Sequence, residues 1–276
     1  MTHFRTDLAE ESHQHYRLSR GRDHDGVRLH RYAQDIFSIC DLYVDTDNAA
    51  RELCKPCGRY LTATCPSLTL SDSRWIHTAA RELSVLLREL LPPSGTVLVL
   101  GLGNRNITPD RLGSAVMDHL IVTRHLREVM PETFGHMRPV CALAPGVLGI
   151  TGIETGEIAR ALVRQLQPTT VLAIDALCAA EADRLCTSFQ FSDTGIAPGS
   201  GAGNHREALT EKTLGVPVIA AGVPTVIAGG TNQHPLLMTP TDIDLIIGKC
   251  ARVLGYAADM ALQGELTPEE LDSFLC

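Results

Sequence analysis

Two short apolar runs constrain the fold of this chain more than any other feature. They span residues 96–100 and 170–174, are rich in β-branched side chains, and each follows an amphipathic helical pattern. Strands that are apolar throughout are typical of sheets buried on both faces. The alternation of such strands with helices predicts an α/β protein with a mainly parallel central sheet.

Further segments extend this pattern. Residues 74–91 carry apolar side chains at spacings of three and four, which predicts a helix packed on the sheet. A third apolar run contains Pro217, which favours the start of a strand or a position near a sheet edge. Thr239 followed by Pro240 predicts the N-cap of a long C-terminal helix, and residues 267–270 repeat this signal for a short last helix.

Length and charge limit the functional class. The chain has 276 residues, of which 44% are hydrophobic, so it can form one large domain or two small ones. A net charge of -8 argues against direct binding of nucleic acid, because phosphate binding requires an excess of lysine and arginine. Residues 1–25 are polar, which predicts an exposed arm. Since no signal peptide or membrane-spanning run is present, we expect a cytoplasmic protein.

The nine cysteines do not form a convincing metal motif. Cys54 and Cys57 have CxxC spacing and could join Cys40 and Cys65 in a zinc site. A second CxxC is absent and no histidine follows at zinc-finger distance. We therefore expect free thiols and no metal.

Two acidic residues follow the predicted central strands. Asp110 ends a glycine-containing turn that begins at Gly101, and Asp175 directly follows the run 170–174. Ligands of open parallel sheets collect at the carboxyl ends of the strands. Two carboxyls close together share a proton and can hydrolyse a peptide, one as base and the other as acid. The alternative is that Asp110 caps a helix and that Asp175 is a turn residue.

Other polar residues could support such a site. Asn104 lies in the turn before Asp110, and Glu154 begins a predicted helix, where it either lines the cleft or interacts with the helix dipole. Asp193 lies in the glycine-rich loop 192–204, whose free backbone amides could bind substrate or an oxyanion, or which is a plain surface loop.

Histidine-dependent chemistry has little support in the sequence. No nucleophile motif of the type GxSxG and no HExxH zinc motif occurs. His119 and His125 could complete a metal site with the two aspartates, although packing or solvent-facing roles are the simpler interpretation.

Several ordered motifs resemble the germination protease family. They include Gly-Leu-Gly-Asn-Arg-Asn-Ile-Thr-Pro-Asp, which ends at Asp110, and Ala-Ile-Asp-Ala-Leu, which contains Asp175. The complete set of matching segments is 101–113, 122–126, 145–155, 173–177, 192–204, 213–220 and 222–226.

The resemblance implies an endopeptidase that degrades small acid-soluble spore proteins in the cytoplasm of the forespore and spore core. It implies Asp110 and Asp175 as the catalytic pair, no cofactor, and a homotetramer. The implied fold is a three-layer sandwich similar to the hydrogenase maturation proteases, of the phosphorylase/hydrolase-like kind. Members are made as self-processing zymogens, and the matching cut here lies between Asp7 and Leu8. Residues 1–7 would form the propeptide, and residues 8–276 would form a single peptidase domain.

The chain departs from the family pattern in two respects. The implied propeptide is short, and a long insert that members carry after Gly230 is missing. Two other functions are therefore considered: a metal-assisted maturation-type peptidase that uses the two aspartates, and a binder of spore proteins without catalytic activity.

Overall fold

The computed structural model describes residues 5–65, 73–199, 206–231, 234–264 and 266–275. In these parts of the chain the strands form one nine-stranded sheet in the order β1-β2-β3-β7-β8-β6-β4-β5, with β9 paired to β8. The strands are β1 (Val27–Gln34), β2 (Phe37–Val44), β3 (Gly58–Thr64), β4 (Val97–Gly101), β5 (Val140–Leu143), β6 (Thr170–Ala179), β7 (Ser188–Ser192), β8 (Val218–Thr231) and β9 (His234–Met238).

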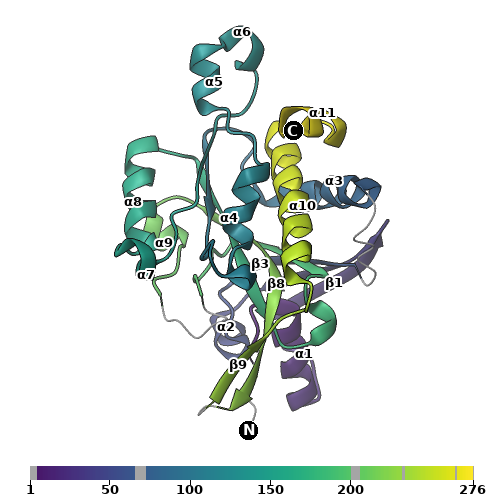
Figure 1. The fold of residues 1–276 in the computed structure, drawn as a ribbon. Helices are drawn as coiled ribbons and strands as arrows, with labels where there is room; N and C mark the ends of the chain where they lie inside the picture. Colours follow the sequence, from purple (N-terminus) through teal and green to yellow (C-terminus); the bar gives the residue numbers. More distant parts are fainter. Residues whose placement is uncertain (1–4, 66–72, 200–205, 232–233, 265, 276) are drawn as a thin grey trace.

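The helices cover both faces of this sheet (Figure 1). The α-helices are α1 (Ala9–Arg20), α2 (Asp47–Leu53), α3 (Ser73–Leu90), α4 (Leu112–Val116), α5 (Arg124–Val129), α6 (Pro131–Phe134), α7 (Leu148–Thr151), α8 (Thr155–Leu166), α9 (Glu211–Leu214), α10 (Ile243–Gln263) and α11 (Pro268–Leu275). Three 3-10 turns are η1 (Thr108–Asp110), η2 (Met117–His119) and η3 (Ala182–Arg184).

The α/β class predicted from the sequence is confirmed, and the sheet is mixed. Strands β5, β4, β6 and β8 pair in parallel, whereas β1, β2, β3 and β7 pair antiparallel and join the parallel half through β7 and β8. The two halves therefore meet along β8, which pairs in parallel with β6 and antiparallel with β7 and β9.

Alternate side chains of the strands bury against different helices, which produces three layers. On β4, Val97 and Val99 belong to the core beneath α3 and α10, whereas Leu98 and Leu100 belong to the core beneath α8. In the antiparallel half, α1 and α2 pack on the same side as α8, against residues such as Leu42. Figure 1 shows α5 and α6 projecting at one end and the β8–β9 hairpin at the other.

The predicted exposed arm at the N-terminus is wrong for the described part of that segment. Residues 9–20 form α1, and both Leu8 and Ala9 are fully buried. The prediction was wrong because it took polar residues to be exposed. Glu10 and Glu11 are buried, and they bond to Arg31 of β1 and to the Ala180 amide after β6.

Two predicted boundaries shift in the structure. Asp175 lies within β6 and does not end it, because β6 and β8 continue their pairing as far as Ala179. The long C-terminal helix begins at Ile243, and the hydroxyl of Thr239 donates to the Thr225 carbonyl of β8 without capping a helix. The short last helix starts as predicted, with reciprocal Thr267 and Glu270 hydrogen bonds. Over the ranges that the structure describes, none of the helices has the length and apolarity to cross a membrane.

Candidate active site

A pocket of about 960 Å³ opens where the two halves of the sheet meet. Its lining comes from the N-terminal segment, one side of α1, the end of α2, the loop after β7, and the strands β6, β7 and β8. Both Asp175 and Asp7 line it. A segment predicted to be removed therefore lies in the same pocket as a predicted catalytic acid.

Asp175 is held inside the sheet with only 4% of its surface exposed. Its Oδ1 accepts a hydrogen bond of 2.9 Å from the Ala176 amide, and the backbone of Gly199 also donates to it. Burial, followed by the negative charge of Asp110, raises the pKa of Asp175 well above its ordinary value. Asp7 adds to this effect. The carboxyl therefore keeps its proton to a higher pH than an exposed aspartate.

Asp110 is the last residue of η1 and is half-buried. The Asn104 amide donates to its Oδ2 at 2.8 Å, and burial raises the pKa of Asp110 although that hydrogen bond and Arg206 oppose the rise. Gly103 has φ of 94°, and a Cβ there would lie 1.9 Å from the Asp110 carbonyl oxygen. The turn therefore needs glycine to bring η1 against β4.

The negative charge of Asp110 acts on Asp175. Asp110 is not among the residues that line the pocket, but its charge is near enough to raise the pKa of Asp175. When two neighbouring carboxyls have raised pKa values, one can be ionised while the other is protonated. Such a pair can activate a water molecule and donate a proton in the same reaction.

The segment around Asp7 runs beside the end of β6. The Asp7 amide donates to the Cys178 carbonyl at 2.8 Å, and the Cys178 amide donates to the Asp7 carboxylate at 2.8 Å. Leu8 is fully buried and clusters with Leu177 and Ala179. The peptide bond between Asp7 and Leu8 is therefore fixed next to the strand that carries Asp175.

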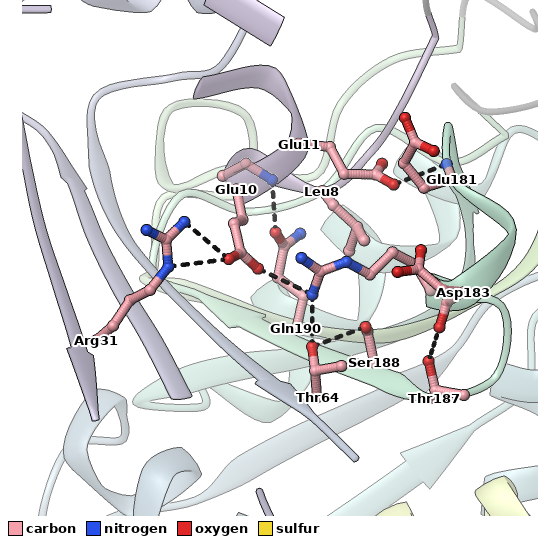
Figure 2. Close-up of polar contacts among 12 residues, drawn as sticks. Leu8, Glu10, Glu11, Arg31, Thr64, Glu181, Asp183, Thr187, Ser188 and Gln190 are labelled. Carbon is pink, nitrogen blue, oxygen red and sulfur yellow. Dashed lines mark hydrogen bonds and ion pairs between the residues drawn. The ribbon is translucent and has the colours of Figure 1, made fainter. Parts of the chain in front are cut away.

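Two glutamates anchor the chain just after this bond (Figure 2). Glu10 lies between two arginines, with Arg31 at 3.1 Å and Arg184 at 3.1 Å. Glu11 accepts hydrogen bonds of 2.9 Å from the amides of Ala180 and Glu181. We call these six residues the glutamate anchor. It attaches α1 to β1 and to the turn after β6.

The sequence did not identify two further polar residues beside Asp7. Lys55 donates from Nζ to the Thr6 carbonyl at 2.9 Å, and burial lowers the pKa of its ammonium group. Gln190, on β7, donates from Nε2 to the Asp7 carbonyl at 3.0 Å. The only sequence signal for Gln190 is an amide between Phe189 and Phe191, both buried in the core.

The other predicted site residues lie elsewhere. Asn104 contacts Asp110 through its main chain, whereas its side-chain oxygen accepts from the Asn106 amide. Asp193 is exposed and accepts from the Arg59 amide, so it supports the start of β3. Glu154 precedes α8 without a side-chain cap. Neither Glu154 nor Asp193 lines the pocket.

The candidate metal ligands do not come together. Cys54 and Cys57 are exposed, whereas Cys40 and Cys65 are buried. His119 packs against Gly255 of α10. Within the described ranges no group of three or more His, Cys, Asp or Glu side chains is arranged to hold a metal ion.

A buried carboxyl in a pocket, with a second carboxyl near enough to raise its pKa, can activate water. The model of a family described as germination protease matches residues 5–233. A germination protease of Clostridium perfringens is 37% identical over 324 aligned positions that cover 100% of both chains. One from Clostridium acetobutylicum is 44% identical over 326 positions, again 100% of both. One from Bacillus cereus is 40% identical over 231 positions, which cover 81% of this chain and 63% of the relative.

The chain therefore belongs to the germination protease family and is a peptidase. The aligned span of 324 positions exceeds the 276 residues of this chain, so the Clostridium perfringens relative has segments that this chain lacks. Among solved structures, a [NiFe] hydrogenase maturation protease, HycI from Thermococcus kodakarensis, is similar with a TM-score of 0.38 and 17% identity. The match covers 64% of this chain and 98% of that one.

Proposed function

We propose that this chain is an endopeptidase that starts the degradation of small acid-soluble spore proteins when a spore germinates. Membership of the germination protease family supports this role. The net charge of -8 is consistent with a function that acts on the protein coat of DNA and does not bind DNA itself. The site of action would be the cytoplasm of the forespore and the spore core, and the assembly a homo-oligomer, a tetramer by resemblance.

We also propose that the chain is a zymogen whose residues 1–7 are removed by its own active site. The observation that carries this proposal is that Asp7 and Asp175 line one pocket. The N-terminal segment lies in the pocket as a substrate would, and it obstructs other substrates until it leaves. Residues 8–276 would then be the active peptidase.

The proposed reaction is direct hydrolysis by Asp110 and Asp175. The ionised carboxylate takes a proton from water, and the resulting hydroxide attacks the carbonyl carbon of the peptide bond. The protonated carboxyl then gives its proton to the leaving nitrogen, and the carbon–nitrogen bond breaks. The products are a new carboxylate and a new amine, and no covalent intermediate forms.

The test is to incubate the purified full chain alone and with a small acid-soluble spore protein, and to weigh all products by mass spectrometry. The proposal expects loss of residues 1–7 by a cut after Asp7, followed by a few defined cuts in the spore protein. Parallel reactions with a chelator separate aspartate chemistry from metal-assisted hydrolysis, because only the latter would stop. An intact spore protein in every reaction would favour the function of a binder without catalysis.

A further inference from the structure

Gln190 makes two hydrogen bonds that span the junction between Asp7 and Leu8. Its Nε2 donates to the carbonyl oxygen of Asp7 at 3.0 Å, and its Oε1 accepts from the amide of Ala9 at 2.8 Å. The side chain is buried, with 7% exposed. Figure 2 shows Gln190 rising from the sheet toward the first turn of α1.

The orientation of this amide follows from its partners. A main-chain carbonyl can only accept a hydrogen bond, and a main-chain N–H can only donate one. The Nε2 group of Gln190 must therefore face the Asp7 carbonyl, and Oε1 must face the Ala9 amide. An N–H donor is thus directed at the oxygen of the peptide bond that self-processing would cleave.

The sheet aligns Gln190 with Asp175. Both residues pair with Gly222 of β8, Gln190 from one side and Asp175 from the other. Residues paired across a sheet project on the same face, and two strand spacings separate their Cα atoms by about 10 Å. All three residues line the pocket.

Gly222 lets neighbouring groups approach the main chain of β8 closely. A Cβ at this position would lie 2.6 Å from Cγ of Leu177 and 2.7 Å from the Asp175 carbonyl oxygen. Leu177 in turn packs against Leu8. The absence of a side chain at position 222 therefore lets Leu177, which contacts Leu8, lie close to the strand that pairs with both Gln190 and Asp175.

We infer that Gln190 is a catalytic residue, which donates a hydrogen bond to the carbonyl oxygen of the scissile peptide as that oxygen becomes an oxyanion. Water adds to the carbonyl carbon of Asp7, its proton passes to the ionised aspartate, and the negative charge on oxygen faces Nε2 of Gln190. The tetrahedral species then expels the Leu8 nitrogen, which takes a proton from the second aspartate. A hydrogen-bond donor directed at a developing oxyanion stabilises the transition state more than it stabilises the neutral carbonyl of the ground state.

The second hydrogen bond of Gln190 positions the leaving side of the junction. By accepting from the Ala9 amide, Oε1 fixes the residue that follows the leaving nitrogen. A peptide substrate bound in the same way would present the same carbonyl and the same amide, since both belong to the main chain. This inference rests on the proposed self-processing, and the experiment below separates the two.

The experiment measures the first-order rate at which the full chain loses residues 1–7, by intact mass, as a function of pH. Gln190→Glu keeps an oxygen for the Ala9 amide but, when ionised, has no donor for the Asp7 carbonyl. Removal of one oxyanion donor costs about 10²- to 10³-fold in rate. We expect that loss at neutral pH. We also expect the ratio of variant to parent rate to rise as the pH falls, because a protonated glutamate can donate again.

Two matched variants complete the design. Gln190→Met has similar length and no donor at any pH, so its processing rate should stay low in acid. If the glutamate variant does not fold, the processing rate of Gln190→Met alone is compared with that of the parent. Gln263→Glu makes the same change in a glutamine outside the pocket. Gln263 also accepts from one main-chain amide and donates to one main-chain carbonyl, both of Arg138. This control should process at the parent rate.

Each result has one meaning for the inference. Equal rates for the parent and both Gln190 variants overturn it, as does a loss that is the same at every pH in the glutamate and methionine variants, which would indicate packing only. An Asp175→Asn chain run alongside tests the proposed function. If that chain still loses residues 1–7, or if the parent never does, the proposed function fails whatever Gln190 does.

Discussion

Two buried carboxyls near the N-terminal segment, Glu10 and Asp175, have different neighbours. On the side of α1, Glu10 lies between Arg31 and Arg184. On the side of the parallel strands, burial and the negative charge of Asp110 raise the pKa of Asp175. The two arginines compensate the buried charge of Glu10, whereas burial and Asp110 make ionisation of Asp175 unfavourable.

The same chemical group, a carboxyl, is therefore suited to different roles at the two places. A carboxylate held between two arginines forms ion pairs and can anchor a helix, as Glu10 does for α1. A buried carboxyl that lies near a second negative charge retains its proton to a higher pH and can exchange that proton with water. Substitutions at the two kinds of carboxyl and at their partners can test this distinction.

Asp175→Asn should abolish self-processing and cleavage of a spore protein. Replacing a general acid or base costs about 10²- to 10⁴-fold, so we expect a loss at the upper end of that range. Asparagine removes a buried charge that like charges disfavour, so the folded state should not lose stability at neutral pH. The measurements are the processing rate by mass spectrometry and the urea midpoint.

Asp259→Asn is the matched control for that variant. Asp259 is also fully buried and its burial raises the pKa well above the ordinary value, but it lies on α10 and both its oxygens accept from the Ile121 amide. The control should process at close to the parent rate. An inactive but folded Asp259→Asn chain would show that burial of an acid, and not its position, decides activity.

Arg184→Met should weaken the glutamate anchor and slow self-processing. Glu10 would keep only Arg31, and Arg184 would no longer donate to Thr64. Removing one partner of a buried charge costs about 3 kcal/mol, so unfolding should become easier and α1 should dissociate more often. We expect a processing rate reduced by about tenfold, with urea denaturation reporting the stability loss.

Arg160→Met provides the comparison, because Arg160 pairs with Glu207 at the surface. Such exposed pairs contribute little to stability, because water screens the two charges. If both arginine variants process equally fast, the anchor does not position the junction.

The free energy of unfolding should fall as the pH rises above the ordinary aspartate value of 3.8. Asp259 and Asp175 have folded-state pKa values above those of the unfolded chain, so the native state binds more protons in that window. Their contribution is complete below pH 3.8 and is lost as the pH rises through the folded-state value, at up to about 1.4 kcal/mol per pH unit for each group. Urea titrations of the parent and Asp259→Asn at several pH values should give a flatter profile for the variant.

Lys55→Met should have the smallest effect. The ammonium group of Lys55 donates one hydrogen bond to the Thr6 carbonyl, and burial already lowers its pKa. Loss of one hydrogen bond costs about 1 kcal/mol, so the processing rate should fall by about fivefold. A rate unchanged from the parent would remove Lys55 from the groups that hold the N-terminal segment.

Much of the parallel half was predictable from the sequence, because strands such as 96–100 and helices such as 74–91 have strong local patterns. The antiparallel half was less predictable from the sequence. Strand β7 contains Gln190 among apolar residues, and α1 buries glutamates, so composition alone suggested neither a site nor a packed helix. Only the partners from distant strands explain why those polar groups are buried.

Buried strands and ordered motifs are local properties, so the α/β class, the family and the two candidate aspartates could be predicted from the amino-acid sequence alone. The tertiary structure decided that Asp7, Asp175 and Gln190 meet at one pocket, and that Glu154 and Asp193 do not. Strand pairing is the physical reason: β6 and β7 are brought together only through their shared register with Gly222, which no local pattern specifies.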